Sequence, residues 1–292
     1  MKYAHIKHWR QEFTVQLMCR VLEVSVSGFY AWLSRKPSAR TISNAALSLH
    51  VQAAHNRNRG TYGNIRLQRD LAKRGIHICD SRLRNIRKKL NLRAKQTKKF
   101  KATTNSNHHF PVSPNLLSRA FKVQRPNQAW VSDITYIHTA QGWLYLAGIK
   151  DLYSGEIVGY AMSERMTKEL VMKALFRAVS TQRPAKGLIY HSDRGSQYCA
   201  LDFQRLLKQF GMQSSMSRKG DCWDNAPMES FWGTLKNELV FHRSYQTREE
   251  AIQDISEYIE IFYNRQRIQK RLGYKSPAEA TQEYYRNLKK MA

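Results

Sequence analysis

The order of extended and helical segments after residue 128 is the feature that most restricts the fold. Apolar, β-branched and aromatic residues form three short runs over 130–137, 143–149 and 157–162, which we expect to be strands. A fourth, buried strand is expected over 188–190, with helical spacing on either side of it. Strands that are followed by alternating helix and strand predict a mixed sheet covered by helices.

Helices are predicted around the last of these strands. Apolar residues recur at helical spacing over 170–178 and 203–210. A third helix is expected to be capped by Asn225, to carry Pro227 in its first turn and to run to about Val240. The sequence therefore predicts an α/β core over residues 120–245.

Three acids occupy distinctive positions in these predicted elements. Asp133 lies within the first strand. Asp193 comes 60 positions later, just after the buried strand, and Glu229 lies a further 36 positions on, in a predicted helix. Three carboxylates in one cleft need a counter-charge, which a divalent metal supplies. Mg²⁺ prefers such oxygen ligands, and two ions roughly 3.5–4 Å apart can stabilise both the attacking and the leaving oxygen in phosphoryl transfer. We expect one metal site acting on a phosphodiester.

Several polar residues near these acids have two interpretations. Lys236 lies two turns after Glu229 on the same helix face, so it either holds a DNA phosphate or is an ordinary exposed lysine. Four others either orient the substrate or only cap and pack: Asn225, His191, Gln197 and Tyr198. Three further acids lie in turns, where we expect turn or capping roles: Asp151, Asp221 and Asp224.

The net charge indicates a polyanionic partner. Lys and Arg number 49 against 22 Asp and Glu, which leaves +27, and nucleic acid is the commonest partner of so basic a chain. A membrane is the competing partner, but no run of about 18 apolar residues and no signal-like apolar segment is present. We expect a soluble cytoplasmic protein. The four cysteines form no C-x-x-C pair, so neither a zinc site nor a disulfide framework is indicated.

Residues 13–35 predict two short helices joined by a turn that Ser25 or Ser27 caps. This pattern fits a DNA-binding helix-turn-helix and equally an ordinary helical hairpin.

A second helical unit is predicted over 61–93. One helix stops at Gly75, and Asp80 or Ser81 is expected to cap the next. Residues 61–101 contain 14 Lys and Arg but only two acids. A one-sided charge run is often a solvated face, but phosphate binding with counterion release explains it better. We expect residues 1–93 to bind DNA, with contacts from Arg82, Arg84, Arg87, Lys88 and Lys89.

The remaining segments are a linker and a C-terminal extension. Residues 94–119 form a basic, polar linker, in which His108 and His109 are expected to be solvated. Residues 246–292 predict one long and one shorter helix, and the segment Ser276-Pro277-Ala278-Glu279 starts the shorter one.

Three sequence blocks carry a family resemblance. Residues 126–136, 191–198 and 224–231 resemble the catalytic blocks of retroviral-integrase-like insertion-sequence transposases, and the 35 residues between Asp193 and Glu229 match their Asp, Asp, 35, Glu signature. The tail over 263–277 is similar to that of the IS-three-type family, in which a second reading frame encodes the catalytic protein. The pattern departs at Gln269, where many relatives carry His.

The resemblance implies an RNase H-like fold with Asp133, Asp193 and Glu229 as ligands of two Mg²⁺ ions, with Mn²⁺ as a substitute. It also implies cleavage by water to free a 3′-hydroxyl, then strand transfer by that hydroxyl, without a covalent protein intermediate. The expected partners are element and target DNA, further copies of the chain, and an upstream-frame helix-turn-helix protein or fusion. Nucleoid association in a bacterial cytoplasm would follow.

Two other functions fit part of the sequence. An RNase H or junction nuclease would use the same sheet and acids but form no joined product. A regulator would bind element ends without catalysis, which the complete set of three acids argues against.

Overall fold

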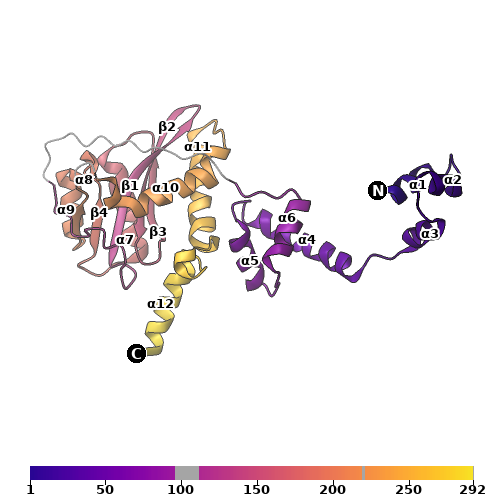
Figure 1. Cartoon of the computed structure of the whole chain (residues 1–292). Helices are drawn as coiled ribbons and strands as arrows, with labels where there is room; N and C mark the ends of the chain where they lie inside the picture. Colours follow the sequence, from indigo (N-terminus) through magenta and orange to yellow (C-terminus); the bar gives the residue numbers. More distant parts are fainter. Residues whose placement is uncertain (96–111, 219–220, 292) are drawn as a thin grey trace.

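A computed structural model describes residues 1–95, 112–218 and 221–291 (Figure 1). Most of the predicted linker, including His108 and His109, lies outside these ranges. The described chain consists of helices at its N-terminal side, a five-stranded sheet with helices on both faces, and a C-terminal helix.

Six helices precede the sheet: α1 (Lys2–Trp9), α2 (Val15–Val21), α3 (Val26–Ser34), α4 (Ala39–Arg57), α5 (Asn64–Lys73) and α6 (Asp80–Lys89). Helices α2 and α3 are the pair predicted over 13–35. Ser25 is its cap, because the Ser25 hydroxyl accepts a hydrogen bond from the Gly28 amide. Together with α1 they enclose a small core of their own around Ile6 and Phe29, and α4 links it to the rest (Figure 1).

Helices α4, α5 and α6 form the second helical unit and bury Val51, Leu67 and Leu83 between them. The long helix α4 was not predicted. The predicted cap of α6 is wrong: the helix begins at Asp80 after Cys79, and no side chain caps it. The Asp80 carboxylate instead accepts a hydrogen bond from the Asn64 amide, since the two residues face each other across the unit.

The described sheet has the strand order β3-β2-β1-β4-β5, with two antiparallel pairs, β3·β2 and β2·β1, and two parallel pairs, β1·β4 and β4·β5. The first three predicted strands are present, and the short strand predicted over 188–190 is β4; only β5 was not predicted. Their bounds are β1 (Ala129–Thr139), β2 (Gly142–Asp151), β3 (Ile157–Ser163), β4 (Ile189–Ser192) and β5 (Gln213–Met216). This order, with helices on both faces, confirms the predicted RNase H-like α/β class.

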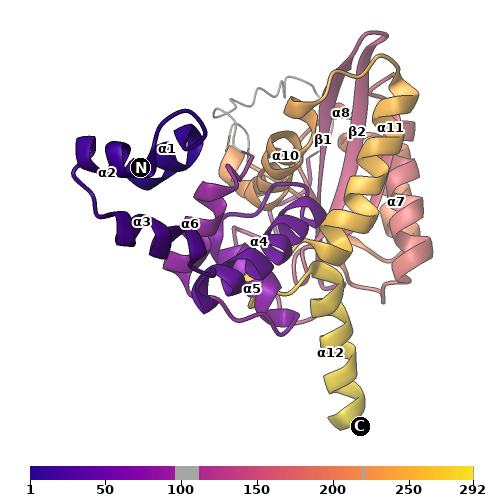
Figure 2. The same cartoon turned by 90° about the vertical axis from the view of Figure 1, so that its right-hand side faces the viewer.

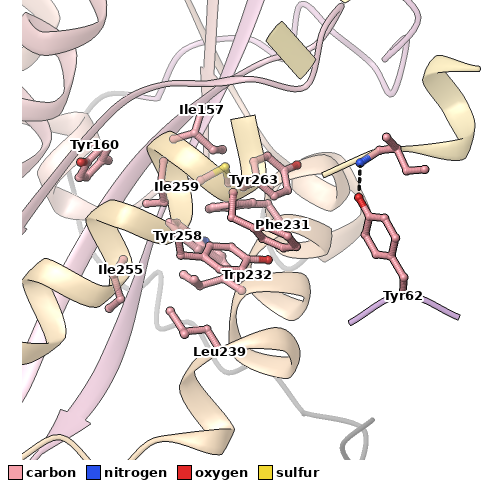
Figure 3. Close-up of a cluster of buried hydrophobic side chains, with 14 of the residues drawn as sticks. Tyr62, Ile157, Tyr160, Phe231, Trp232, Leu239, Ile255, Tyr258, Ile259 and Tyr263 are labelled. Atoms are coloured by element: carbon pink, nitrogen blue, oxygen red, sulfur yellow. Dashed lines mark hydrogen bonds between the residues drawn. The ribbon is translucent and has the colours of Figure 1, made fainter. Parts of the chain in front are cut away.

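Different helices cover the two faces of the sheet (Figures 1 and 2). One face packs against α7 (Lys168–Gln182), α8 (Ser196–Cys199) and α9 (Leu201–Gln209). The other face packs against α10 (Ala226–Glu238), α11 (Arg248–Glu257) and the π-helix η3 (Tyr258–Gln266) that continues α11. The aromatic side chains of this second core surround Phe231 and Tyr258 (Figure 3).

The C-terminal extension ends in α12 (Pro277–Met291), which follows two short 3₁₀ turns, η2 (Val240–His242) and η4 (Lys270–Leu272). The predicted start of α12 is confirmed as a capping box. The Glu279 amide donates to the Ser276 hydroxyl, and the Ser276 amide donates to the Glu279 carboxylate. The proposed boundary at residue 245 stays a prediction, and α11 packs on the sheet beyond it. No helix in the described ranges is long and apolar enough to span a membrane.

Gly148 sets the distance between β2 and α10. A Cβ atom at this position would lie 2.5 Å from Cε of Met228 and 2.7 Å from Cη2 of Trp232. Both of these α10 side chains are buried, and the indole ring cannot move aside without disturbing its neighbours. The absence of a side chain at residue 148 therefore lets α10 lie directly on the sheet.

We predict that Gly148→Ala destabilises the protein by about 1–3 kcal/mol, because the added methyl group overpacks the contact with Trp232. Urea unfolding measures this change. The matched control is Gly233→Ala within α10, where an added Cβ meets no atom within 4 Å. That substitution should stabilise the helix by about 0.5–1 kcal/mol. Equal effects of the two substitutions would contradict this account of Gly148.

Candidate active site

The fold brings the three predicted acids toward one region on the α10 side of the sheet. Asp133 lies in the middle of β1, opposite Gly148 of β2. Strands β1 and β4 are parallel neighbours, and Asp133 and Asp193 each lie two positions beyond the paired residues Val131 and His191. Glu229 lies in the first turn of α10, the helix that packs across β1.

Asp133 is the most strongly perturbed of these acids. Its carboxylate accepts a hydrogen bond of 3.0 Å from the Trp232 indole nitrogen. Burial raises the pKa of Asp133 to about 8, and the negative charges of Asp193 and, less strongly, Glu229 add to this shift. Burial also raises the pKa of Glu229. The three acids therefore interact electrostatically through Asp133.

The carboxylate of Asp193 is oriented by its own turn. The Gly195 amide donates a hydrogen bond of 2.9 Å to Asp193 Oδ1. The following Arg194 donates through Nε to the Ser217 carbonyl beyond β5, which fixes the loop against its neighbour strand. This local geometry holds the second acid at the end of β4, where the sequence predicted it.

The donor chemistry fits a hard divalent cation. All three candidate ligands are carboxylates, and within the described ranges neither Asp133 nor Glu229 forms a salt bridge. A cation would supply a counter-charge for Asp133, whose pKa is raised by burial and by the charge of Asp193. The three carboxylates do not converge on one point, since among the described residues no three His, Cys, Asp or Glu side chains form a group that could hold a metal.

Lys236 and Asn225 are both buried beside this region. The exposed-lysine interpretation of Lys236 is wrong, because only 5% of the residue is exposed and its ammonium lies 4.9 Å from the centre of the Tyr136 ring. Burial lowers the pKa of Lys236, and the charge of Asp133 opposes that shift. Asn225 donates to the Ser132 carbonyl next to Asp133, while its own buried oxygen has no partner among the described residues. Asn225 therefore acts on β1, and the predicted side-chain cap is absent.

The other polar neighbours form hydrogen bonds within the fold. His191 lies between the Ser215 and Ser217 hydroxyls, where burial lowers its pKa to about 4. Tyr198 shares a hydrogen bond with the Ser132 hydroxyl, and Gln197 donates to the Met166 carbonyl.

Asp151 and Asp221 take the turn roles that were expected, whereas Asp224 is held in ion pairs instead. Asp151 accepts from the amide and hydroxyl of Ser154, and Asp221 accepts from the Trp223 amide. Asp224 is bound by Arg218 and Arg119, and the hydrogen bonds from Arg218 lower its pKa.

The predicted DNA contacts on α6 fall into two groups. Three arginines are engaged within the helical unit. Arg82 donates to Ser43 and Asn44, Arg84 pairs with Asp80, and Arg87 donates to Asn64. Lys88 and Lys89 are exposed.

Two buried interactions were missed in the sequence. The Trp232 hydrogen bond to Asp133 joins residues that are 99 positions apart. Arg267 forms a buried salt bridge with Glu238, whose carboxylate also accepts from the Tyr258 hydroxyl. Only the helical spacing of Glu229 and Trp232 could have indicated that Trp232 faces the acids.

Family models and related proteins match most of the chain. Profiles described as integrase core domain match residues 123–222 and 229–287, and a profile described as HTH-like domain matches residues 42–100. The insertion element IS600 uncharacterized 31 kDa protein of Shigella sonnei is 59% identical over 92% of this chain and 98% of its own length. Transposase InsF for insertion sequence IS3A of Escherichia coli is 39% identical over 96% of this chain and 98% of its own.

Solved structures with lower similarity are integrases. A simian T-cell lymphotropic virus intasome in complex with PP2A regulatory subunit B56 gamma matches with 16% identity and a TM-score of 0.46, over 73% of this chain and 70% of that one. The HTLV-2 integrase catalytic core domain in complex with magnesium matches with 16% identity and a TM-score of 0.42, over 54% of this chain and 97% of that one.

The raised pKa of Asp133 predicts a stability that depends on pH. The folded chain retains this proton up to about pH 8, whereas the unfolded chain releases it near its ordinary value of 3.8. Stability in the presence of a chelator should therefore fall as pH rises between these values, by up to about 1.4 kcal/mol per pH unit. Asp133→Asn should flatten this dependence in urea unfolding. Glu12→Gln, at an exposed acid in the turn between α1 and α2, is the control that keeps the wild-type slope. An unchanged slope in Asp133→Asn would contradict the assignment.

Proposed function

Because the chain belongs to the IS3-type family of insertion-sequence transposases, which carry an integrase core domain, we propose that Asp133, Asp193 and Glu229 catalyse the cleavage and joining of DNA strands at the element ends. The observation that carries this proposal is the electrostatic interaction of the three acids through Asp133, on two parallel strands and the helix that crosses them. Membership of this family favours a transposase over the nuclease and the regulator.

The three carboxylates would hold Mg²⁺, with Mn²⁺ as a substitute and two ions as the proposed number. Bound there, the metal would neutralise negative charge on the reacting phosphate and activate the attacking oxygen. The protein's own contribution is to orient the ligands. Trp232 holds one oxygen of Asp133, and the Gly195 amide holds one oxygen of Asp193. Lys236 would place a DNA phosphate next to the acids.

The proposed reaction has two displacements at phosphorus. In the first, the oxygen of water attacks the phosphodiester at the element end, and the bond from phosphorus to the 3′-oxygen breaks. The products are a 3′-hydroxyl on the element and a 5′-phosphate on the flanking strand. In the second, that 3′-hydroxyl attacks a phosphodiester of the target and displaces its 3′-oxygen. No bond to the protein forms in either step.

DNA would reach the acids through the helical regions. We propose that residues 1–93 bind the element ends, that several copies of the chain assemble on DNA, and that an upstream-frame helix-turn-helix protein or fusion completes the active enzyme. Its place in the cell would be the bacterial nucleoid.

Substitution of the acids tests the catalytic proposal. Asp133→Asn, Asp193→Asn and Glu229→Gln should each reduce strand transfer by about a thousandfold or more, because each removes a charged metal ligand worth several kcal/mol. Joined product on element-end DNA, with the chain alone and fused to the upstream frame, is the measurement. Asp202→Asn, an exposed acid in the first turn of α9, is the matched control with unchanged activity. DNA affinity should remain near that of the wild type in all four variants. Full strand transfer by any of the three site variants would refute the acid assignment.

The division of the α6 cations gives a separate prediction. Lys88→Gln combined with Lys89→Gln should reduce the slope of log affinity for DNA against log salt by about two, one for each lost phosphate contact. Unfolding should be unaffected, since both side chains are exposed. Arg87→Gln should instead lower stability by about 1–3 kcal/mol, because Arg87 donates to Asn64 inside the unit. An unchanged salt slope in the double variant would remove these lysines from the DNA interface.

A further inference from the structure

A cavity of about 870 Å³ lies on the other side of α10 from the acids, and its lining contains seven Lys and Arg side chains. We call it the basic cavity. Its walls come from helix α5, the segment before β1, the end of strand β2, helix α10, and the C-terminal extension from η3 to α12. The cations that line it and have no carboxylate partner among the described residues are Arg66, Lys122, Lys150, Lys270 and Arg271.

Acids neutralise only part of the charge around the basic cavity. Arg267 is paired with Glu238 in a buried salt bridge, and Lys275 is paired with Glu283 at the rim. Among the described residues that line the cavity, Glu283 is the one acid. The other five cations therefore face the cavity with an uncompensated positive charge.

Lys150 is a buried cation in the wall of this cavity. Only 7% of this residue is exposed, and its ammonium donates to the Pro227 carbonyl at 2.8 Å. An ammonium has three N–H donors, so two remain for other acceptors. Burial, together with the smaller effect of the charges of Arg271 and Arg267, lowers the pKa of Lys150 to about 7. A buried cation beside two guanidinium groups is costly unless an anion compensates it.

Gln269 adds a second buried donor in the same wall. This residue is 8% exposed, and its oxygen accepts a hydrogen bond from Arg271. Its amide nitrogen is buried and has no acceptor in the described part of the chain, although the Tyr263 hydroxyl lies beside it. A buried N–H without an acceptor costs about 1–3 kcal/mol. Lys150 and Gln269 thus both present donors to a cavity surrounded by positive charge.

We propose that the basic cavity binds phosphate groups of the DNA backbone. A phosphodiester offers charged acceptor oxygens, which would accept from Lys150 and Gln269 while Lys270 and Arg271 balance the charge. This contact is separate from the acids, since α10 lies between the two sites. The inference requires DNA as the ligand, but it does not require that the acids be catalytic.

The shape of the surface favours a polymer over a small anion. A second cavity adjoins the first, because both are lined by Arg66, Ser230 and Thr234, and it extends to Lys95 and Asn237. The two together follow α10 from Pro227 to Asn237, a length of about 15 Å. Successive nucleotides of one strand rise by about 3.4 Å along the duplex axis, and their phosphates lie farther apart than this because they also rotate about the axis, so more than one phosphate fits along this helix. A free phosphate would occupy only one end.

Two cavity variants and a charge-matched control test the proposal. Lys122→Gln combined with Lys270→Gln removes two exposed cations that line the cavity, and Lys150→Met replaces the buried ammonium with an apolar chain. The control combines Lys208→Gln on α9 with Lys289→Gln on α12, two exposed lysines outside the lining. The readout is fluorescence anisotropy of labelled duplex DNA between about 50 and 200 mM salt, together with urea unfolding.

Both cavity variants should bind DNA about tenfold more weakly or worse, because each loses a charge-assisted contact of about 1.5–3 kcal/mol. The double variant should also lose about two units of salt slope. The control should stay near the wild-type affinity. Lys150→Met should be as stable as the wild type or more so, which a purely structural role for Lys150 would not produce.

A free polyphosphate is the alternative source of the same chemistry. Thermal unfolding with added tripolyphosphate or ATP separates it from DNA. If these anions stabilise the wild type but not Lys150→Met, and DNA affinity is equal in all variants, the phosphate site stands but the DNA assignment falls. If the cavity variants match the control in both measurements, the proposal is overturned. Asp133→Asn, which keeps the cavity intact, shows whether a failure belongs to the cavity or to catalysis.

Discussion

The close contact between α10 and the sheet is the constraint on which the rest of this structure depends. It exists because Gly148 has no side chain, so that Trp232 can lie directly on β2. From that position the indole also donates to Asp133, while Glu229 lies three residues earlier on the same helix. One packing interaction therefore fixes both the depth of the hydrophobic core and the approach of the helix-borne acid to the strand-borne acids. Any change that lifts α10 would separate them.

The same helix connects the core to the other parts of the chain. Glu238 at its C-terminal end accepts from Arg267 and Tyr258, which attaches the C-terminal extension to α10. The extension in turn holds the helical unit, because the Tyr62 hydroxyl accepts from the Ile268 amide (Figure 3). Ion pairs between Arg59 and Glu257 and between Lys73 and Glu279 lie on the same interface. The DNA-binding helices are thus placed relative to the acids through buried hydrogen bonds.

Local sequence patterns predicted the features that depend on residues close together in the chain. The apolar, β-branched and aromatic runs and the polar turn after residue 190 were enough to select Asp133 and Asp193, and helical spacing placed Lys236 on the face of Glu229. Strand β5 was not predicted because Gln213–Met216 is a short, mostly polar segment, and its buried Ser215 hydroxyl is satisfied by His191 from the neighbouring strand. The basic cavity was missed for a related reason. Lys150 reads as the polar end of a strand, and only the fold brings it near residues 267–271.

Acids lie on one side of α10 and cations on the other, so the like charges within each group repel one another. Burial and the neighbouring acids raise the pKa of Asp133, and burial and the neighbouring guanidinium groups lower the pKa of Lys150. A divalent cation would relieve the first and a phosphate the second. DNA brings both, since its phosphates attract metal ions and occupy basic grooves. Because α10 carries Glu229 toward one site and Ser230 and Thr234 toward the other, a strand bound along the cavity would lie within one helix width of the acids. The free energy of ligand binding would then oppose the repulsion that both sites retain in the unbound chain.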